Sequence, residues 1–358
     1  MIVVAGEALI DLMARPGEPQ QFEARPGGAP CNVAVGLARL GRRTCFLGRI
    51  GTDPFGRLLR QHLAGSGVDA SMVVTATQKT TLAVAALDGQ GKAEYSFYAN
   101  GTADWQWTDA EVPRVLPADA GALYVGGLAL RLSPGAAVLE GLMRRTRQQR
   151  RALVFCDPNV RTGFGFSAAV ERSRVERQLR LAHVIKASED DIALLYPGHD
   201  YREIAARWQA GGAGLVVVTL GAAGVYALAP DGTEITVPSV PAQVMDTVGA
   251  GDAFAAAMLD RLAEEMPAGP GPDPDPAEAL RKVGVDAIRG LLERASVSAA
   301  LTCERAGAQS PDARTLDAAM ADVLRSPLPA EQRASPLPAE QPGSPPSAEQ
   351  RGIGLEPG

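Results

Sequence analysis

Short apolar segments alternate along this chain with segments of helical periodicity. The apolar segments have the length of buried strands and lie at 2–6, 44–51, 122–127, 152–159, 183–188 and 215–221. Between most of them, apolar residues recur three or four positions apart, as they do over 32–41. Parallel strands need a crossover connection between them, and helices usually provide it. The alternation therefore predicts an α/β fold with a largely parallel sheet.

Composition excludes several classes of protein. The 358 residues are 46% hydrophobic and 21% charged, which is enough for one large core. A net charge of −6 argues against a nucleic-acid partner. The first residues carry no basic segment and no apolar run is long enough to span a bilayer, so we expect a cytoplasmic protein without a membrane partner. Four widely spaced cysteines and three histidines form no metal-ligand or disulfide pattern.

Three regions depart from the alternation. Residues 81–98 contain two strand-like runs around a Gly-rich turn, which predicts a hairpin, either a lid or a plain sheet edge. Residues 266–278 are rich in Pro and Gly, and we expect a surface loop there. Residues 326–358 repeat a Pro-rich nine-residue unit, which predicts a disordered tail after a domain over 1–325.

The segment "DTVGAGDAF" at 246–254 combines glycines, one carboxylate and the start of a helical run. Gly249, Ala250 and Gly251 fall at the predicted helix start, where unpaired N–H groups and the helix dipole favour an anion. Asp252 falls in the first turn. It is either a chemical base or a residue that only complements the dipole.

Four more polar or Gly-rich groups follow predicted strands, where open α/β sheets bind ligands. They are Asp11; Gly27, Gly28 and Asn32; Asp157, Asn159 and Arg161; and Thr219, Gly221 and Gly224. Three of these groups contain a residue with a plainer interpretation: a helix cap for Asn32, a surface position for Arg161, and a tight turn for the last group. A glycine-rich helix start beside a carboxylate suits phosphoryl transfer to a hydroxyl. Neither GxxxxGK[ST] nor a GxGxxG turn after the first strand is present, which argues against P-loop and Rossmann enzymes.

The chain resembles the PfkB (ribokinase-like) carbohydrate kinases. "DTVGAGDAF" resembles the C-terminal signature of that family, and "PGGAPCNVAVGLARLG" followed by "IGTDPFG" resembles its N-terminal signature. The resemblance covers residues 1–325. It implies a three-layer α/β/α sandwich with a small β-sheet lid, formed by 81–98 and part of 11–25. It also implies a sugar hydroxyl as acceptor, ATP as phosphoryl donor and Mg²⁺ on the phosphates.

The resemblance also implies roles for individual residues. Asp252 is the expected general base, and the N–H groups of Gly249, Ala250 and Gly251 are the expected anion hole. The expected sugar-binding residues are Asp11, Gly27, Gly28 and Asn32, with Arg161 facing a phosphate or the substrate. The expected nucleotide-side residues are Thr219, Gly221 and Gly224, with 299–308 near the adenine.

Cation sites are less well matched to the family pattern. Asp246 and the Val248 carbonyl match positions that hold a monovalent cation such as K⁺ in some members, although Asp246 also suits a turn. Many members have Asn-x-x-Glu where this chain has Ser188 and Asp191. Asp191 is the expected contact to Mg²⁺ through water, and its shorter side chain puts that role in doubt. The neighbouring Glu189 and Asp190 carry the same charge.

Two further segments narrow the range of candidate substrates. "GGAPCN" and "GTADWQWT" (101–108) resemble the fructokinase branch, and in particular bacterial fructokinases. One alternative is a 2-keto-3-deoxygluconate kinase, with Arg161 near the substrate carboxylate. A more distant one is an inactive sugar or nucleotide sensor. Trp105 and Trp107 either line the sugar pocket or pack in the core. The resemblance also allows a homodimer formed through the lid.

Overall fold

A computed structural model of the chain describes residues 1–15, 18–87, 93–161, 167–266 and 275–325. The predicted tail at 326–358 and the turn of the predicted hairpin lie outside the described residues. No described helix is both long enough and apolar enough to cross a lipid bilayer.

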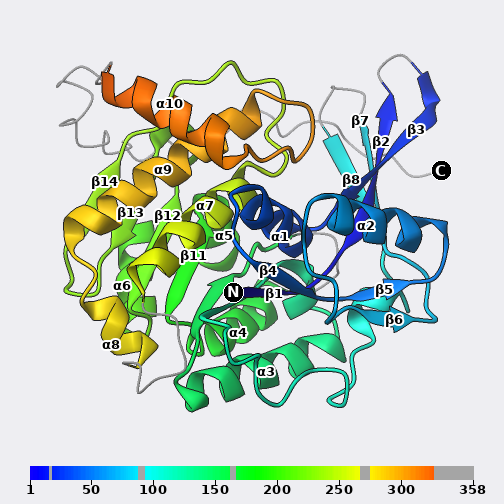
Figure 1. Ribbon diagram of the computed structural model, residues 1–358, viewed down its shortest axis with the longest axis horizontal. Coiled ribbons are helices and arrows are strands. Elements are labelled where there is room, and N and C mark those ends of the chain that lie inside the picture. Colours follow the sequence, from blue (N-terminus) through cyan, green and yellow to red (C-terminus); the bar gives the residue numbers. More distant parts are fainter. Residues whose placement is uncertain (16–17, 88–92, 162–166, 267–274, 326–358) are drawn as a thin grey trace, which may run out of the picture. The chain divides into compact units, whose positions relative to one another are not determined.

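An eight-stranded sheet forms the centre of the molecule (Figure 1), in the order β14-β13-β12-β11-β10-β9-β1-β4. Its strands are β1 (Ile2–Ala5), β4 (Thr44–Leu47), β9 (Ala122–Gly126), β10 (Leu153–Asp157), β11 (Val184–Ser188), β12 (Leu215–Thr219), β13 (Val225–Leu228) and β14 (Glu234–Val237). All strand pairings from β4 to β12 in this order are parallel. Strand β13 pairs antiparallel with both β12 and β14. The largely parallel α/β sheet predicted from the sequence is confirmed.

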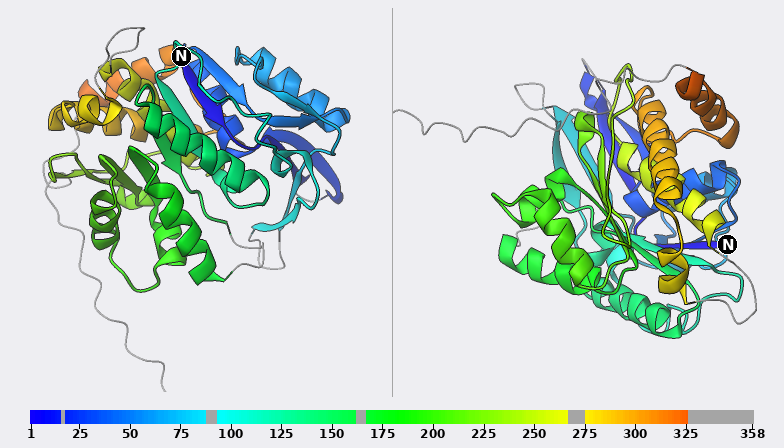
Figure 2. Two further views of the ribbon diagram at one scale, coloured as in Figure 1. Left: turned by 90° about the horizontal axis from the view of Figure 1, so that it is seen from below. Right: turned by 90° about the vertical axis from the view of Figure 1, so that its left-hand side faces the viewer.

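Helices cover both faces of this sheet. They are α1 (Ala29–Arg39), α2 (Pro54–Gly65), α3 (Gly135–Gln149), α4 (Ala168–Leu179), α5 (Glu189–Leu195), α6 (Tyr201–Ala210), α7 (Ala250–Glu265), α8 (Pro276–Arg281), α9 (Val285–Cys303) and α10 (Ala313–Arg325). One core joins the sheet to α1, α7 and α9, and the other joins it to α3–α6. Figure 2 shows the green α4–α6 and the yellow-to-orange α7–α9 on opposite sides of the strands. This is the expected three-layer arrangement.

A second sheet of four strands stands beside the first, in the order β3-β2-β7-β8. Its strands are β2 (Leu9–Arg15), β3 (Glu18–Gly27), β7 (Leu82–Leu87) and β8 (Ala93–Tyr98). Strands β7 and β8 pair antiparallel, as the hairpin prediction requires. Strand β2 pairs parallel with β7 and antiparallel with β3. Asp11 therefore lies within β2 of this small sheet, and not directly after β1 as the sequence suggested.

The predicted single strand at 44–51 is wrong. It divides into β4 of the large sheet and β5 (Arg49–Gly51), which pairs with β6 (Val74–Ala76) in a separate two-stranded sheet. Gly48 separates β4 from β5, and a Cβ atom at Gly48 would lie 2.3 Å from the Phe46 ring. The chain changes sheet at a residue where any larger side chain would displace the buried Phe46 ring.

Two helix boundaries also differ from the predictions. The helix expected over 32–41 begins earlier, at Ala29, with Gly28 as its N-cap. Helix α8 starts at Pro276, inside the loop predicted over 266–278, and the Asp275 side chain caps it. Proline is compatible with a first helical position, because its missing N–H group has no partner there.

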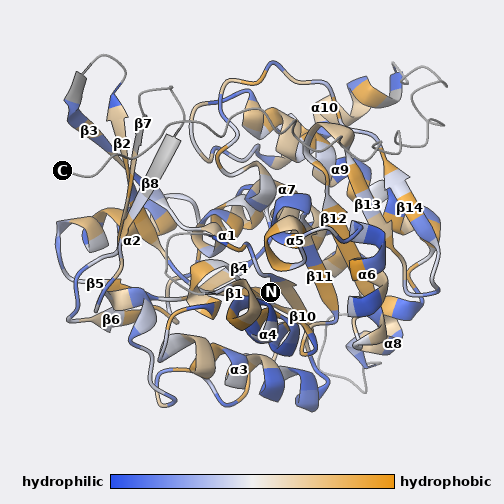
Figure 3. Ribbon diagram, turned by 180° about the vertical axis from the view of Figure 1, so that it is seen from behind, coloured by the Kyte–Doolittle hydropathy of each residue, from blue (hydrophilic) through white to orange (hydrophobic). Residues whose placement is uncertain are grey.

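The 101–108 segment contributes to the core. Trp105 ends a short 3₁₀ turn, η1 (Ala103–Trp105), and both Trp105 and Trp107 are almost fully buried in the core on the α3–α6 side. Their packing interpretation is therefore confirmed. Figure 3 shows apolar residues along β12, one of the strands of the large sheet.

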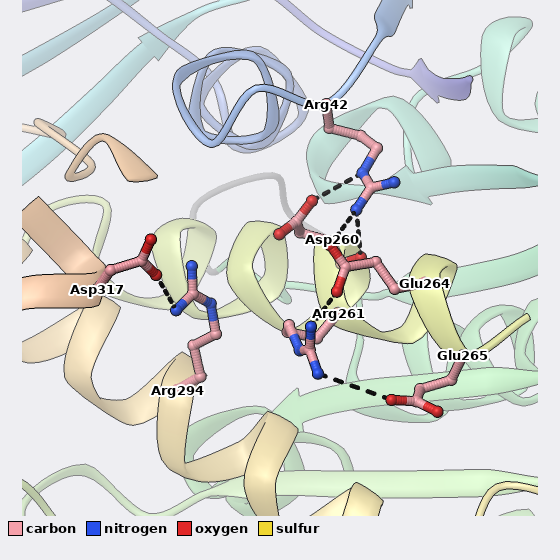
Figure 4. Close-up of polar contacts among 7 residues, drawn as sticks. All are labelled: Arg42, Asp260, Arg261, Glu264, Glu265, Arg294 and Asp317. Carbon is pink, nitrogen blue, oxygen red and sulfur yellow. Dashed lines mark hydrogen bonds and ion pairs between the residues drawn. The ribbon is translucent and has the colours of Figure 1, made fainter. Parts of the chain in front are cut away.

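Helix α7 packs apolar residues into the core, and ion pairs lie along its other side and between its neighbours α9 and α10 (Figure 4). Arg42 binds Asp260 of α7 at 2.7 Å, and Arg294 of α9 binds Asp317 of α10 at 2.6 Å. The Asp260 side chain is only 7% exposed, so the cost of burying its charge offsets much of the attraction to Arg42. We therefore assign most of the stability of α7 to apolar residues such as Leu259, which is fully buried.

We expect Leu259→Ala to lower the free energy of unfolding by about 2–5 kcal/mol, because it leaves a cavity between α7 and its neighbours. Leu194→Ala is the matched control, since Leu194 is 40% exposed. Urea titration followed by circular dichroism measures both variants. Equal losses of stability in the two would contradict this account of α7.

Candidate active site

The start of α7 is shaped by a glycine in the left-handed region. Gly249 is the N-cap with φ 80°, and a Cβ atom there would lie 2.4 Å from the Ala308 Cβ. The Ala250 N–H donates to the Thr247 carbonyl at 3.3 Å. Within the described part of the chain the Gly251 N–H has no acceptor, so it is available to a ligand. The predicted helix start is confirmed, with one of its N–H groups already engaged.

Asp252 occupies the first turn of α7 and is 9% exposed. The Asn32 Nδ2 donates to its Oδ2 at 2.8 Å. Burial raises the pKa of Asp252, while the bond from Asn32 and the charges of Lys186 and Arg161 oppose that shift. Asn32 lies inside α1, so the interpretation of it as a helix cap is wrong. Its amide is directed at the expected base.

The small sheet brings a second carboxylate to this point. Burial, and then the charge of Asp252, raise the pKa of Asp11 to about 6. A Cβ atom at Gly27 would lie 2.0 Å from the Asp11 Oδ2, so this glycine makes room for the carboxylate. Gly28 has φ 97°, and a Cβ atom there would lie 2.9 Å from the Glu7 carbonyl oxygen. The structure thus gathers Asp11, both glycines and Asn32 close to Asp252.

A buried lysine, which the sequence reasoning did not single out, lies beneath the start of α7. The Lys186 Nζ donates to Asp157 Oδ2 at 2.8 Å, and both side chains are buried. The same nitrogen is 3.2 Å from the position of a Cβ atom at Gly251. Burial lowers the pKa of Lys186, but Asp157, Asp191 and Asp252 together outweigh this effect, and the net shift of the pKa is upward. The sequence signal that could have indicated Lys186 is its position as a charged residue inside the apolar run 183–188.

The position of Lys186 indicates an anion site. The N-terminus of a helix carries partial positive charge, so a cation there does not stabilise the helix itself. Here a charged ammonium group and the free N–H of Gly251 lie at the same helix end. Their positive potentials add. A transferring phosphoryl group, whose charge is spread over its oxygens, is a suitable ligand for that arrangement.

Arg161 lies on the loop that follows β10, and Asp191 lies in the first turn of α5, directly after β11. Arg161 is exposed, and its Nη1 donates to the Val160 carbonyl at 3.2 Å. Asp191 accepts from the Val160 N–H at 2.6 Å and from the N–H and Oγ of Ser188 at 2.8 Å each. Asp191 therefore forms a capping box with Ser188 at the start of α5. Its described contacts join the loop after β10 to the start of α5.

The residues predicted for the nucleotide side lie at the end of β12 and in the turn between β12 and β13. Thr219 ends β12, and Gly221 begins the short 3₁₀ turn η3 (Gly221–Ala223). Gly224 has φ 99°, and a Cβ atom there would lie 2.2 Å from the Val237 carbonyl oxygen. Both the backbone conformation and the lack of space therefore require glycine at position 224. Gly221 has φ 54° and open space around its Cα, which leaves room for a ligand.

Asp246 ties together two loops at the same end of the sheet. Its Oδ1 accepts from the Val248 N–H at 3.0 Å, and its Oδ2 accepts from the Gly307 N–H at 2.7 Å. The Cys303 carbonyl accepts from the N–H groups of Met245 and Asp246. The segment after α9 is thereby fixed against the loop that leads into α7.

Comparison with known proteins gives one consistent result. Residues 1–315 match the model of the pfkB family carbohydrate kinases. The chain is 37% identical over 265 residues to a fructokinase of Rhizobium leguminosarum bv. trifolii, which covers 73% of this chain and 79% of the relative. It is also 37% identical over 268 residues to a fructokinase of Klebsiella pneumoniae, with 73% and 84% covered.

Solved structures agree with the sequence relatives. A fructokinase with bound ATP from Xylella fastidiosa superposes with a TM-score of 0.81 and 31% identity, over 90% of this chain and 98% of that one. A fructokinase double mutant from Vibrio cholerae O395, with fructose, ADP and potassium ion bound, gives a TM-score of 0.76 and 28% identity over 88% and 97%.

We expect Gly249→Ala to destabilise the protein more than Gly41→Ala. Both residues have a positive φ, but the surroundings of Gly41 are open, whereas Gly249 faces Ala308. The left-handed backbone alone costs about 1–2 kcal/mol for alanine. The clash at Gly249 adds to that value. Urea unfolding of both variants measures the difference, and equal losses would show that the close approach of residue 308 is not a real constraint.

Proposed function

We propose, because the chain belongs to the pfkB family of carbohydrate kinases, that it transfers the terminal phosphoryl group of ATP to a hydroxyl group of fructose. The observation that carries this proposal is the buried Asp252 carboxylate, hydrogen-bonded to Asn32 at the start of α7. The fructokinase relatives and the fructose and ADP in one of the solved structures support fructose as the substrate.

The proposed reaction uses Asp252 as general base. A carboxylate with a raised pKa is a stronger base than one in water, and it accepts the hydroxyl proton as the sugar oxygen attacks phosphorus. Asn32 keeps the carboxylate oriented and charged. The N–H of Gly251 and the Lys186 ammonium stabilise the charge on the transferring phosphoryl oxygens. Gly249 and Ala250 shape this helix start.

Asp11, with Gly27 and Gly28, is proposed to bind the sugar hydroxyls on the side of the small sheet. Arg161 is proposed to face the phosphoryl group or the substrate. On the nucleotide side we propose Thr219, Gly221 and Gly224. The exposed Phe22 on β3 and Tyr98 on β8 support the predicted homodimer through this sheet, which stays a prediction.

The donor groups present indicate how metal ions would bind at this site. Among the described residues no three acidic, His or Cys side chains form a metal-binding group. Mg²⁺ usually keeps several waters and binds through one or two carboxylates and substrate phosphates. That pattern fits an ion that enters on the ATP phosphates, where it neutralises charge, with Asp191 contacting it only through water. K⁺ near Asp246 and the Val248 carbonyl stays a prediction.

The substrate is tested by a coupled ADP-release assay with Mg·ATP. D-fructose, 2-keto-3-deoxygluconate, ribose and adenosine are compared at equal concentration. We expect turnover on fructose well above that on the others. Turnover on the keto-acid instead would overturn fructose and place Arg161 at the substrate carboxylate. ATP binding without turnover on any of the four would favour the sensor alternative.

We expect Asp252→Asn to lower kcat by about 10²–10⁴, the usual contribution of one general base. The Asn32 bond and the packing of α7 do not depend on the lost charge, so binding of fructose and of an ATP analogue should persist. Isothermal titration calorimetry measures that binding beside the rate. Near-normal turnover in this variant would remove Asp252 from the role of base.

We expect the KM for fructose to rise as the pH falls through about 6. The pKa of Asp11 is raised to about 6, so its carboxylate is charged above that pH and protonated below it. The charged form is the better acceptor for sugar hydroxyls. Asp11→Asn should have a higher KM without this pH dependence. If wild type and variant show the same pH profile of KM, another group controls sugar binding.

A further inference from the structure

One arginine of the small sheet reaches the loops on the nucleotide side. Arg25 lies on β3 directly opposite Asp11 on β2. Opposed residues of an antiparallel pair place their side chains on the same face. The Asp11 carboxylate lies over Gly27 on this face. Arg25 therefore shares a surface with the proposed sugar-binding carboxylate.

The Arg25 side chain packs on the backbone of Gly307. From the position of a Cβ atom at Gly307, the Arg25 Nη1 is 2.9 Å away and its Cδ is 3.7 Å away. A side chain at residue 307 would displace the guanidinium. The Nε and Nη2 of Arg25 each donate to a Glu23 carboxylate oxygen at 3.0 Å. This two-pronged bond fixes the plane of the guanidinium.

The contact continues from Gly307 to the start of α7. The Gly307 N–H donates to Asp246 Oδ2, and the other oxygen of Asp246 accepts from the Val248 N–H. Val248 directly precedes Gly249, the N-cap of α7. The charge of Asp246 also favours the cationic Arg25. A chain of direct contacts thus joins the small sheet to the predicted anion hole.

The geometry points to Arg25 as a positioning residue that couples sugar binding on the small sheet to nucleotide binding at the loops before α7 and after α9. This inference rests on the proposed function, because it takes the two ligands to be a sugar and ATP. The structure already contains the contact between Arg25 and Gly307; whichever ligand binds first holds it in place, so the second ligand loses less freedom on binding. Such coupling is reciprocal between the two ligands.

The test is a titration of a non-hydrolysable ATP analogue by calorimetry, with and without saturating fructose. In the wild type we expect fructose to tighten analogue binding by about fivefold or more, the lower end of common coupling factors. In Arg25→Ala this factor should fall close to one, while the affinity for fructose alone and the melting temperature stay unchanged. Arg25→Lys should keep part of the coupling, since it retains the charge.

Arg15→Ala is the matched control. Arg15 is an exposed arginine of the same small sheet, and its Nη1 donates to Gln21 at 3.3 Å. It should keep the wild-type coupling factor. If Arg25→Ala shows the same coupling factor as the wild type, including a factor near one in both, the inference is overturned.

A second measurement separates this inference from the identity of the sugar. Hydrogen exchange of residues 20–27 is followed with the ATP analogue alone. We expect the analogue to slow exchange there in the wild type and in Arg15→Ala, but not in Arg25→Ala. Failure of fructose to bind the wild type would count against the proposed substrate only. Equal protection of residues 20–27 in all three proteins, or in none, would count against Arg25.

Discussion

The hydrogen bond between Asn32 and Asp252 is the constraint on which the site depends. A buried carboxylate is costly unless donors surround it, and this donor comes from a helix 220 positions away in the chain. The bond requires α1 and α7 to pack closely. Gly36 permits that approach, because a Cβ atom there would lie 2.8 Å from the Ala256 Cβ. Small residues in the core therefore let α1 and α7 approach closely enough for Asn32 to reach Asp252.

The charges around Asp252 balance one another. Burial raises the pKa of Asp252, whereas Asn32, Lys186 and Arg161 lower it, and the start of α7 also favours an anion. Asp157 keeps Lys186 charged, and the ammonium group lies close to Gly251 at the start of α7. In the proposed reaction, the base and the anion site therefore lie on the same turn of the same helix. Proton acceptance and phosphoryl stabilisation can then occur side by side.

Much of this arrangement follows from local sequence pattern. The alternating strands, the 81–98 hairpin and the helix start at Gly249 are local features, and the structure agrees with each. The partner of Asn32 and the ion pair of Lys186 are not local, since packing between distant segments creates them. The strand at 44–51 was misjudged because its apolar run hides a change of sheet at Gly48. Helix α8 was missed because prolines near a helix start resemble a loop.

The most direct test of the central claim is the pH profile of kcat at saturating fructose and ATP, in the wild type and in Asn32→Ala. The bond from Asn32 lowers the pKa of Asp252, so its loss should raise that pKa. We therefore predict that the acidic limb of the profile moves to higher pH in the variant. A limb that stays at the wild-type pH, with kcat merely lowered, would contradict a base whose charge Asn32 maintains.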